Sequence, residues 1–197
     1  RFRHFSAVNG LMRAPFLQPG VVSVSSSPYA GVLDASRYPS GIDATLQQVT
    51  SDLESAKIKS QALEDIRPWK NAKLMRNLAN GLQGACGIEV DTSDIMAKLG
   101  EEARAVFAKA GLPVVAPDVF TERTTYAPPS GGGSSGWQSV MRGTGSIEAD
   151  YLNGEIVLLG RQHGVPTPYN EAVRRHANRI ARSKLTPGAC PPEEVPP

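Results

Sequence analysis

The sequence DIRPWKNAKLMRNLANGLQG, residues 65–84, decides the fold of this chain. At 100° per residue, Lys73, Asn77 and Asn80 fall within one narrow arc of a helix. The opposite side of that helix is apolar: Leu74, Met75, Leu78 and Leu82. One amine beside two carboxamides, on a helix whose back is packed, is suited to holding a small polar ligand. The alternative is an ordinary amphipathic surface helix with a solvated polar face.

Composition places the chain among ordinary soluble proteins and excludes several classes. It has 197 residues, 40% hydrophobic and 20% charged, with a formal net charge of +2. Basic residues do not cluster with aromatic ones, which argues against nucleic-acid binding. Cys86 and Cys190 stand far apart without metal-ligand spacing, and the histidines are scattered, so we expect no metal site and a reducing, cytoplasmic location. Apolar runs fall far short of 18 residues, so we expect no membrane contact.

The hydrophobic pattern divides the chain into three parts. Residues 1–63 read as a mixed α/β segment, residues 64–186 as helical, and residues 187–197 as a proline-rich, disordered tail. The chain begins without Met and inside an apparent strand, so we expect a fragment of a longer protein. The strands expected in the first part are 5–11, 20–26, 30–34 and 56–63, with a helix at 41–57. The later helices are expected at 93–110, 137–142, 148–163 and 169–183, with a glycine-rich loop at 127–136.

Common catalytic motifs are absent. No GxGxxG follows a strand, no GxxxxGK[ST] occurs, and no GxSxG indicates a serine hydrolase. Glu148 stands at the start of a predicted helix, where a carboxylate is favoured by the helix dipole, and could be a cap or a ligand contact. Ser134 and Ser135 read as linker residues or as ligand contacts.

Three stretches together resemble the ketopantoate reductase (2-dehydropantoate 2-reductase) family. KLMRN at 73–77, preceded by Ile66 and Trp69, resembles the helix of that family's substrate domain. IEADYLNG at 147–154 looks like the family's TEIDYLNG block, and GRQHGVPTP at 160–168 looks like its HGVPTP continuation.

The resemblance implies a mainly α chain: a helical, 6-phosphogluconate-dehydrogenase-like C-terminal domain preceded by a partial Rossmann remnant. It also implies reduction of a small 2-keto acid such as ketopantoate by NADPH, as in pantothenate biosynthesis. Lys73 matches the family's general acid, and Asn77 matches its substrate-holding Asn. Glu148 matches the acid that binds substrate and positions the lysine. Ser135 is the best match for the substrate-contacting serine, although its spacing to Glu148 is one residue longer.

The sequence also departs from the family pattern. Asn80 stands one position before the place of the family's second Asn, and we retain it as a substrate contact. The glycine fingerprint and the QNG loop of the Rossmann half do not occur where the family has them, so we expect weak or no cofactor binding by this chain and a missing N-terminal Rossmann half as its partner. Three alternatives stay open: a non-catalytic helical module for dimerisation or interaction, a reductase of another keto acid or imine, and Lys70 as the active amine. A homodimer is also possible.

Overall fold

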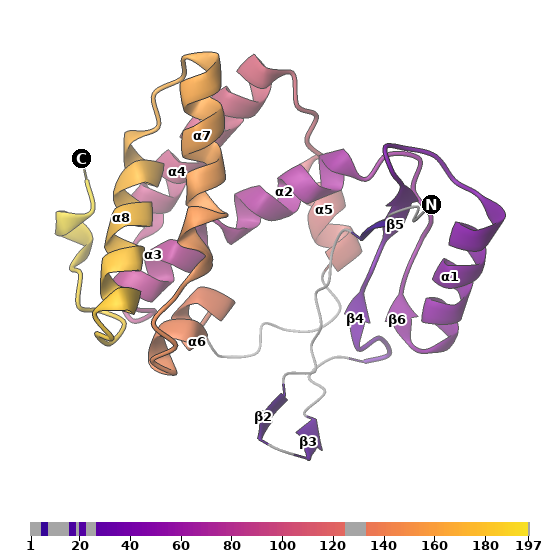
Figure 1. The fold of residues 1–197 in the computed structure, drawn as a ribbon, viewed down its shortest axis with the longest axis horizontal. Coiled ribbons are helices and arrows are strands. Elements are labelled where there is room, and N and C mark those ends of the chain that lie inside the picture. The colour runs from indigo at the N-terminus through magenta and orange to yellow at the C-terminus, as the bar shows by residue number, and fades with distance from the viewer. Residues whose placement is uncertain (1–4, 8–15, 19, 23–26, 125–132, 197) are drawn as a thin grey trace. The chain divides into compact units, whose positions relative to one another are not determined.

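The computed structural model describes residues 5–7, 16–18, 20–22, 27–124 and 133–196. Close contacts divide the chain into two compact units (Figure 1). The first unit comprises residues 1–73 and 113–130, and the second comprises residues 74–112 and 131–197. No helix in the described ranges is long and apolar enough to cross a membrane.

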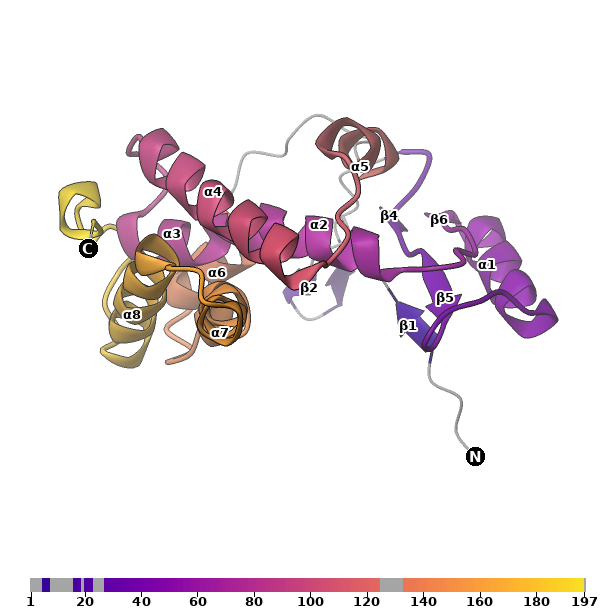
Figure 2. The same ribbon diagram turned by 90° about the horizontal axis from the view of Figure 1, so that it is seen from above.

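The first unit is a small α/β structure. Its centre is a parallel pair, β4 (Gly31–Val32) with β6 (Ile58–Lys59), and the chain between them forms α1 (Ala44–Ser55) (Figure 2). The side chain of Asp43 accepts the backbone N–H of Leu46 and caps α1. This strand–helix–strand arrangement confirms the predicted α/β remnant. The remaining strands are antiparallel: β1 (Phe5–Ala7) with β5 (Ala35–Arg37), and β2 (Phe16–Gln18) with β3 (Val21–Val22).

A helix that the sequence did not predict, α5 (Pro117–Thr124), belongs to this first unit. The ring centroids of Phe120 on α5 and Trp69 lie 6.3 Å apart. Arg123 donates Nε to a carboxylate oxygen of the fully buried Asp34 at 3.1 Å and pairs with it a second time through its terminal nitrogen. The sequence pattern predicted residues 113–124 as part of the helical domain. The contacts that place α5 in the first unit leave no local pattern, because the ring contact joins residues 51 positions apart and the ion pair joins residues 89 positions apart.

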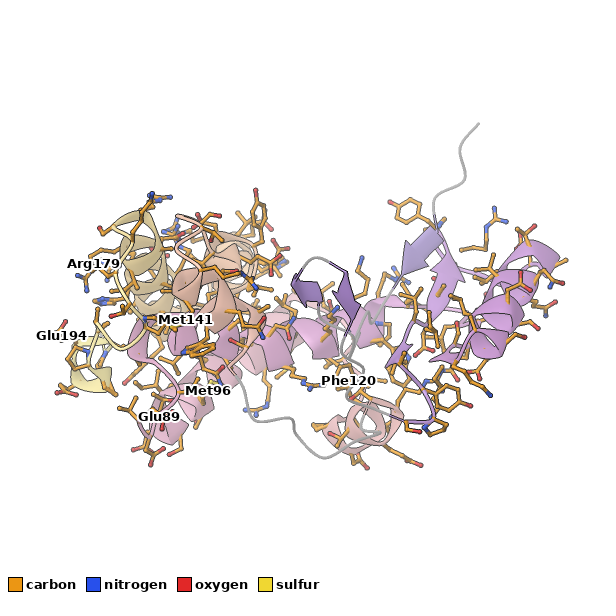
Figure 3. All side chains as sticks on the ribbon, turned by 90° about the horizontal axis from the view of Figure 1, so that it is seen from below. Glu89, Met96, Phe120, Met141, Arg179 and Glu194 are labelled. Atoms are coloured by element: carbon orange, nitrogen blue, oxygen red, sulfur yellow. The ribbon has the colours of Figure 1, made fainter. Side chains whose placement is uncertain are left out.

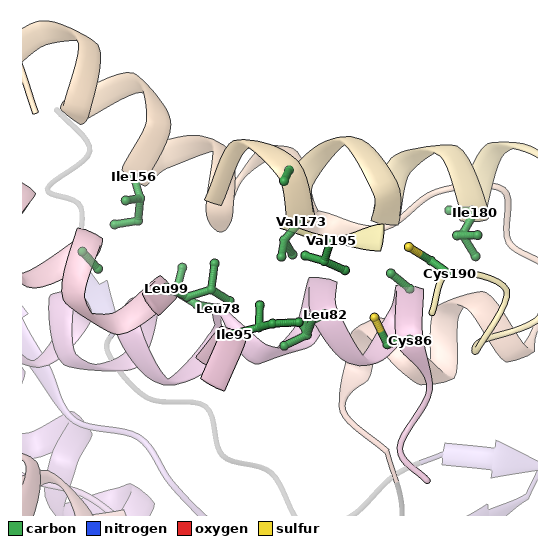
Figure 4. Packing of buried hydrophobic residues seen from close by; sticks show 14 of the residues in the cluster. Leu78, Leu82, Cys86, Ile95, Leu99, Ile156, Val173, Ile180, Cys190 and Val195 are labelled. Carbon is green, nitrogen blue, oxygen red and sulfur yellow. The ribbon is translucent and has the colours of Figure 1, made fainter. Parts of the chain in front are cut away.

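The second unit is helical, and its apolar side chains form one core (Figure 4). Leu99, Ile156 and Val173 are fully buried in that core, one on each of three helices. The helices predicted at 93–110, 137–142, 148–163 and 169–183 are all present, the first of them ending at Gly111 in the left-handed region (φ 66°). Their bounds are α4 (Ser93–Ala110), α6 (Ser135–Met141), α7 (Asn153–His163) and α8 (Pro168–Arg182), with short 3₁₀ turns η1 (Glu148–Asp150) and η2 (Pro192–Glu194).

The starts of α4 and α7 have features that the sequence did not predict. Thr92 is the cap residue of α4 and makes no side-chain cap bond. The carboxylate of Asp91 accepts the backbone N–H of Ser93 at 2.9 Å instead. Glu148 begins the three-residue turn η1, and α7 itself starts only at Asn153.

The C-terminal segment packs on the second unit, so the prediction of a disordered tail is wrong for residues 187–196. The backbone N–H groups of Gly188 and Cys190 both donate to the carbonyl of Ala85, at 3.0 and 3.3 Å. Cys190 and Val195 are fully buried among the core residues. Proline prevents a long helix here, but two apolar side chains at the right spacing still reach the core.

Candidate functional site

The predicted helix at 65–84 is two helices, α2 (Arg67–Asn77) and α3 (Ala79–Cys86), separated at Leu78. The N–H of Leu78 donates to the carbonyl of Met75 at 3.4 Å, so the chain tightens by one residue at this point. Lys73 and Asn77 stand one helical turn apart on α2, and both are half-buried. Asn80 lies on α3 and is only 9% exposed.

Asn80 and Ser135 come together in the second unit. The Asn80 amide nitrogen donates to the Ser135 hydroxyl at 3.2 Å, although the two residues are 55 positions apart in sequence. Ser135 is the first residue of α6 and is exposed. Ser134 caps α6 by accepting the N–H of Trp137, and its own N–H donates to the side chain of Gln83 at 2.9 Å. Two of the five predicted site residues are therefore in direct contact.

Gly136 permits this contact. A Cβ at Gly136 would lie 2.9 Å from the carbonyl carbon of Asn80 and closer still to its oxygen. Any other residue would push α6 away from α3, because backbone atoms cannot move aside as a side chain can. The sequence pattern predicts Gly136 only as the end of a glycine-rich loop. Most of that loop lies outside the described residues, whereas its last residues lead into α6.

The side chain of Asn153 binds the backbone at the junction between α2 and α3. Its side-chain nitrogen donates to the carbonyl of Leu78 at 3.3 Å and to the side-chain oxygen of Asn170 at 3.1 Å. The interruption of the helix at Leu78 is therefore explained by a hydrogen bond from Asn153, which lies 75 residues further along the chain. Asn153 is part of the IEADYLNG stretch, but its burial and its partners could not be read from that motif.

Asn170 ties Asn153 to two further helices. The carboxylate of Glu102 on α4 accepts the backbone N–H groups of Tyr169 and Asn170 at 2.8 and 2.9 Å. It thereby satisfies N–H groups in the first turn of α8 and places a negative charge at that helix N-terminus. The same carboxylate accepts the Asn170 side-chain nitrogen at 2.7 Å, and the Leu99 carbonyl accepts it at 3.3 Å.

Glu148 and Lys73 belong to different units of the structure. Glu148 is exposed at the start of η1 in the second unit, and its carboxylate makes no hydrogen bond or ion pair among the described residues. Lys73 belongs to the first unit and is the last residue of its first segment, on α2.

A hollow of about 560 Å³ lies at the other end of α3 and α6 and contains none of the predicted site residues. Its lining includes Cys86, Trp137, Met141 and Glu89, of which Figure 3 labels the last two. Burial, together with the neighbouring Cys190 thiol, raises the pKa of the Cys86 thiol to about 12. Such a thiol is a poor nucleophile at neutral pH, so we assign it no chemistry.

The two cysteines are nevertheless neighbours, which their distance in the sequence did not indicate. The sulfur of Cys190 lies 3.3 Å from Nδ1 of His176, whose pKa is lowered by burial and then by Arg179 and Arg175. No group of His, Cys, Asp and Glu suited to a metal ion occurs within the described part of the chain.

The comparisons with known proteins point to one family. The family model described as "Ketopantoate reductase PanE/ApbA C terminal" matches residues 65–181, which is more than half of the chain. That range contains the α2–α3 pair, α6 and the helices around Asn153.

Solved structures show the same fold. A PanE/ApbA family ketopantoate reductase from Ralstonia eutropha JMP134 has 21% identity and a TM-score of 0.71, over 91% of this chain and 60% of its own. A 2-dehydropantoate 2-reductase from Methylococcus capsulatus has 24% identity and a TM-score of 0.70, over 91% and 59%. D-Mandelate dehydrogenase, solved with NADH, has 19% identity and a TM-score of 0.72, over 90% and 62%. The chain thus spans about 60% of the length of these proteins.

Proposed function

The chain belongs to the ketopantoate reductase family, and we propose that it supplies the substrate-binding part of an oxidoreductase that reduces a small 2-keto acid to a 2-hydroxy acid with NADPH. The observation that supports this proposal most is the contact between Asn80 and Ser135. Two side chains singled out as substrate contacts from separate stretches of sequence meet at 3.2 Å. Together they offer an amide and a hydroxyl, which can accept and donate hydrogen bonds to a carboxylate or a carbonyl.

Lys73 is the general acid in this proposal. Addition of hydride to the keto carbon places negative charge on the carbonyl oxygen. An ammonium group beside that oxygen stabilises the charge and donates the proton that completes the alcohol. Asn77 stands one turn further along α2 and holds the substrate next to the amine.

Glu148 orients the ammonium group of Lys73 and contributes to substrate binding in this proposal. A carboxylate within hydrogen-bond distance of an amine favours its charged form and restricts its rotamers. The exposure of Glu148 leaves its carboxylate open to such a partner. Asn80 and Ser135 complete the set of residues that we propose to touch the substrate.

NADPH, when bound, supplies the hydride. The residues of this chain do not fit the phosphates of a dinucleotide, because no GxGxxG follows a strand and the GGGSSG stretch at 131–136 follows two prolines. We therefore assign no cofactor-binding residue to this chain. Its own contribution is to bind the keto acid, to align the carbonyl group and to protonate the oxygen.

A second candidate changes the substrate and the cofactor but not the chemistry. The match to D-mandelate dehydrogenase with NADH favours a 2-keto acid with an aryl group at the 2-position, reduced by NADH. The same amine and amides would serve, because the reacting group is again a keto carbonyl beside a carboxylate. Formation of a homodimer stays a prediction.

The experiment that tests the proposal is a reductase assay on the complete natural protein. NADPH or NADH is mixed with ketopantoate, with benzoylformate or with a cyclic imine, and the loss of reduced cofactor is followed by absorbance. We expect the highest kcat/KM with NADPH and ketopantoate. A preference for NADH and benzoylformate selects the second candidate, and a preference for the imine shows that the substrate class is wrong. A protein that oxidises neither cofactor with any of these substrates contradicts the proposal.

A further inference from the structure

Asn153 is a fully buried polar residue at the start of α7, and no role follows for it from the resemblance. Its side-chain nitrogen makes two hydrogen bonds, to the carbonyl of Leu78 and to Oδ1 of Asn170. Its own Oδ1 has no hydrogen-bond partner among the described residues. A buried acceptor without a partner costs free energy, so an apolar side chain of similar size would fill this space more favourably than asparagine.

The orientation of the amide is fixed by its neighbours. Asn170 donates its side-chain nitrogen to the carbonyl of Leu99 and to the carboxylate of Glu102, both of which can only accept. Its Oδ1 must therefore be the atom that faces Asn153, and Asn153 must present its nitrogen. The unpartnered oxygen then faces Gly81, where a Cβ would lie 2.7 Å from it.

The carbonyl that Asn153 binds is located between the two proposed substrate asparagines. Leu78 separates Asn77, the last residue of α2, from Asn80, the second residue of α3. The tightened turn at Leu78 lies between the two asparagines and so affects the direction of both side chains. Asn80 in turn bonds to Ser135, so this turn also bears on that contact.

We propose that Asn153 is a positioning residue, which fixes the α2–α3 junction through the Leu78 carbonyl and so aligns Asn77 and Asn80 on the keto acid. The proposal rests on the proposed function for its catalytic consequence but not for its structural one. Asn153 itself does not touch the substrate. Its anchor is the Asn170–Glu102 pair, which joins it to α4 and α8.

The test uses Asn153→Ala in the complete protein, with Ile180→Ala as the matched control. Ile180 is fully buried in the same core, but it lies ten residues beyond Asn170 on α8, roughly 15 Å along the helix. Both substitutions weaken the fold, and only the first removes the donor to Leu78. Each variant is assayed at a temperature where circular dichroism shows it fully folded.

We expect Asn153→Ala to raise KM for the keto acid about tenfold, the factor that corresponds to about 1.4 kcal/mol of binding free energy. The Kd for the reduced cofactor should stay within twofold of wild type. Hydrogen exchange should increase in the peptide around residues 77–82 and little elsewhere. Ile180→Ala should leave KM within twofold and should spread its exchange over the whole helical unit.

Two results would overturn the proposal: KM within twofold of wild type in Asn153→Ala, or an equal rise in KM in the Ile180→Ala control. If the wild-type protein reduces no substrate, the proposed function fails, and the exchange at residues 77–82 alone decides whether Asn153 fixes the junction. If Asn153→Ala does not fold, Asn153→Ser is measured with the same outcomes, because its hydroxyl lies one bond nearer the backbone and no longer reaches the Leu78 carbonyl, while it still fills part of the space.

Discussion

Replacement of Gly136 by alanine should separate α6 from α3 and break the contact between Asn80 and Ser135. The new Cβ would lie 2.9 Å from the carbonyl carbon of Asn80, whereas two carbon atoms are best separated by about 3.5–4.0 Å. The helices must therefore move apart by roughly 0.6 Å or more. Such a shift lengthens the 3.2 Å bond between Asn80 and Ser135 beyond hydrogen-bond distance.

Overpacking of this kind costs about 1–3 kcal/mol, and the helix propensity of alanine over glycine returns at most about 1 kcal/mol. We therefore expect Gly136→Ala to lower the free energy of unfolding by up to about 2 kcal/mol, measured by urea titration. KM for the keto acid should rise by about 3- to 10-fold, the worth of one hydrogen bond.

Gly100→Ala is the matched control for this prediction. Gly100 also lies within a helix, but its added Cβ would meet only the guanidinium end of Arg104, at 3.3 Å. That side chain is flexible and can move, so the propensity gain should dominate and the variant should be more stable by about 0.5–1 kcal/mol, with KM unchanged. The reasoning is refuted if Gly136→Ala is as stable as Gly100→Ala and binds the keto acid as wild type does.

Two further predictions concern stability. Asp34→Ala removes the fully buried carboxylate that pairs with Arg123 and accepts the backbone N–H of Gln61, so urea unfolding should show a loss of about 3–5 kcal/mol. Asp65→Ala, at the exposed pair with Arg67, should change the midpoint little. Burial raises the pKa of Cys86 in the folded protein to about 12, so above about pH 9 the unfolded chain loses this proton and the folded protein keeps it. The free energy of unfolding should therefore fall by about 1.4 kcal/mol per pH unit as pH rises from about 9 to 12. Cys86→Ala should flatten that decline in urea titrations between pH 8 and pH 10, and an unchanged slope would contradict it.

Local sequence pattern predicted the elements whose apolar side chains repeat with the helical period. α4 and α8 agree with the predicted bounds to within one residue, and α1 lies inside its predicted range. The break at Leu78 could not be predicted, because its cause is the side chain of Asn153, far away in the sequence. Burial of Cys190 in a proline-rich segment likewise depends on the three-dimensional core and not on its neighbours in the chain.

The candidate site was predictable to a similar extent. The contact between Asn80 and Ser135 joins two predicted substrate contacts: Asn80 came from its place on the polar arc of the helix, and Ser135 from the family resemblance. Its geometry depends on Gly136, which the sequence indicated only as the end of a glycine-rich loop. Asn153 is part of the IEADYLNG stretch, but residue type alone does not show whether its side chain is buried or exposed. Positioning residues of this kind become visible only with the hydrogen bonds of the fold.

The role of Lys73 as the general acid is the central claim, and turnover of Lys73→Ala in the complete protein tests it most directly. Lys70→Ala is the control, because Lys70 is the competing amine on the same helix, three residues before Lys73. The account predicts that kcat falls by about 10²- to 10⁴-fold in Lys73→Ala, with the melting temperature unchanged, and stays near wild type in Lys70→Ala. Wild-type turnover in Lys73→Ala, or the larger loss in Lys70→Ala, would contradict it.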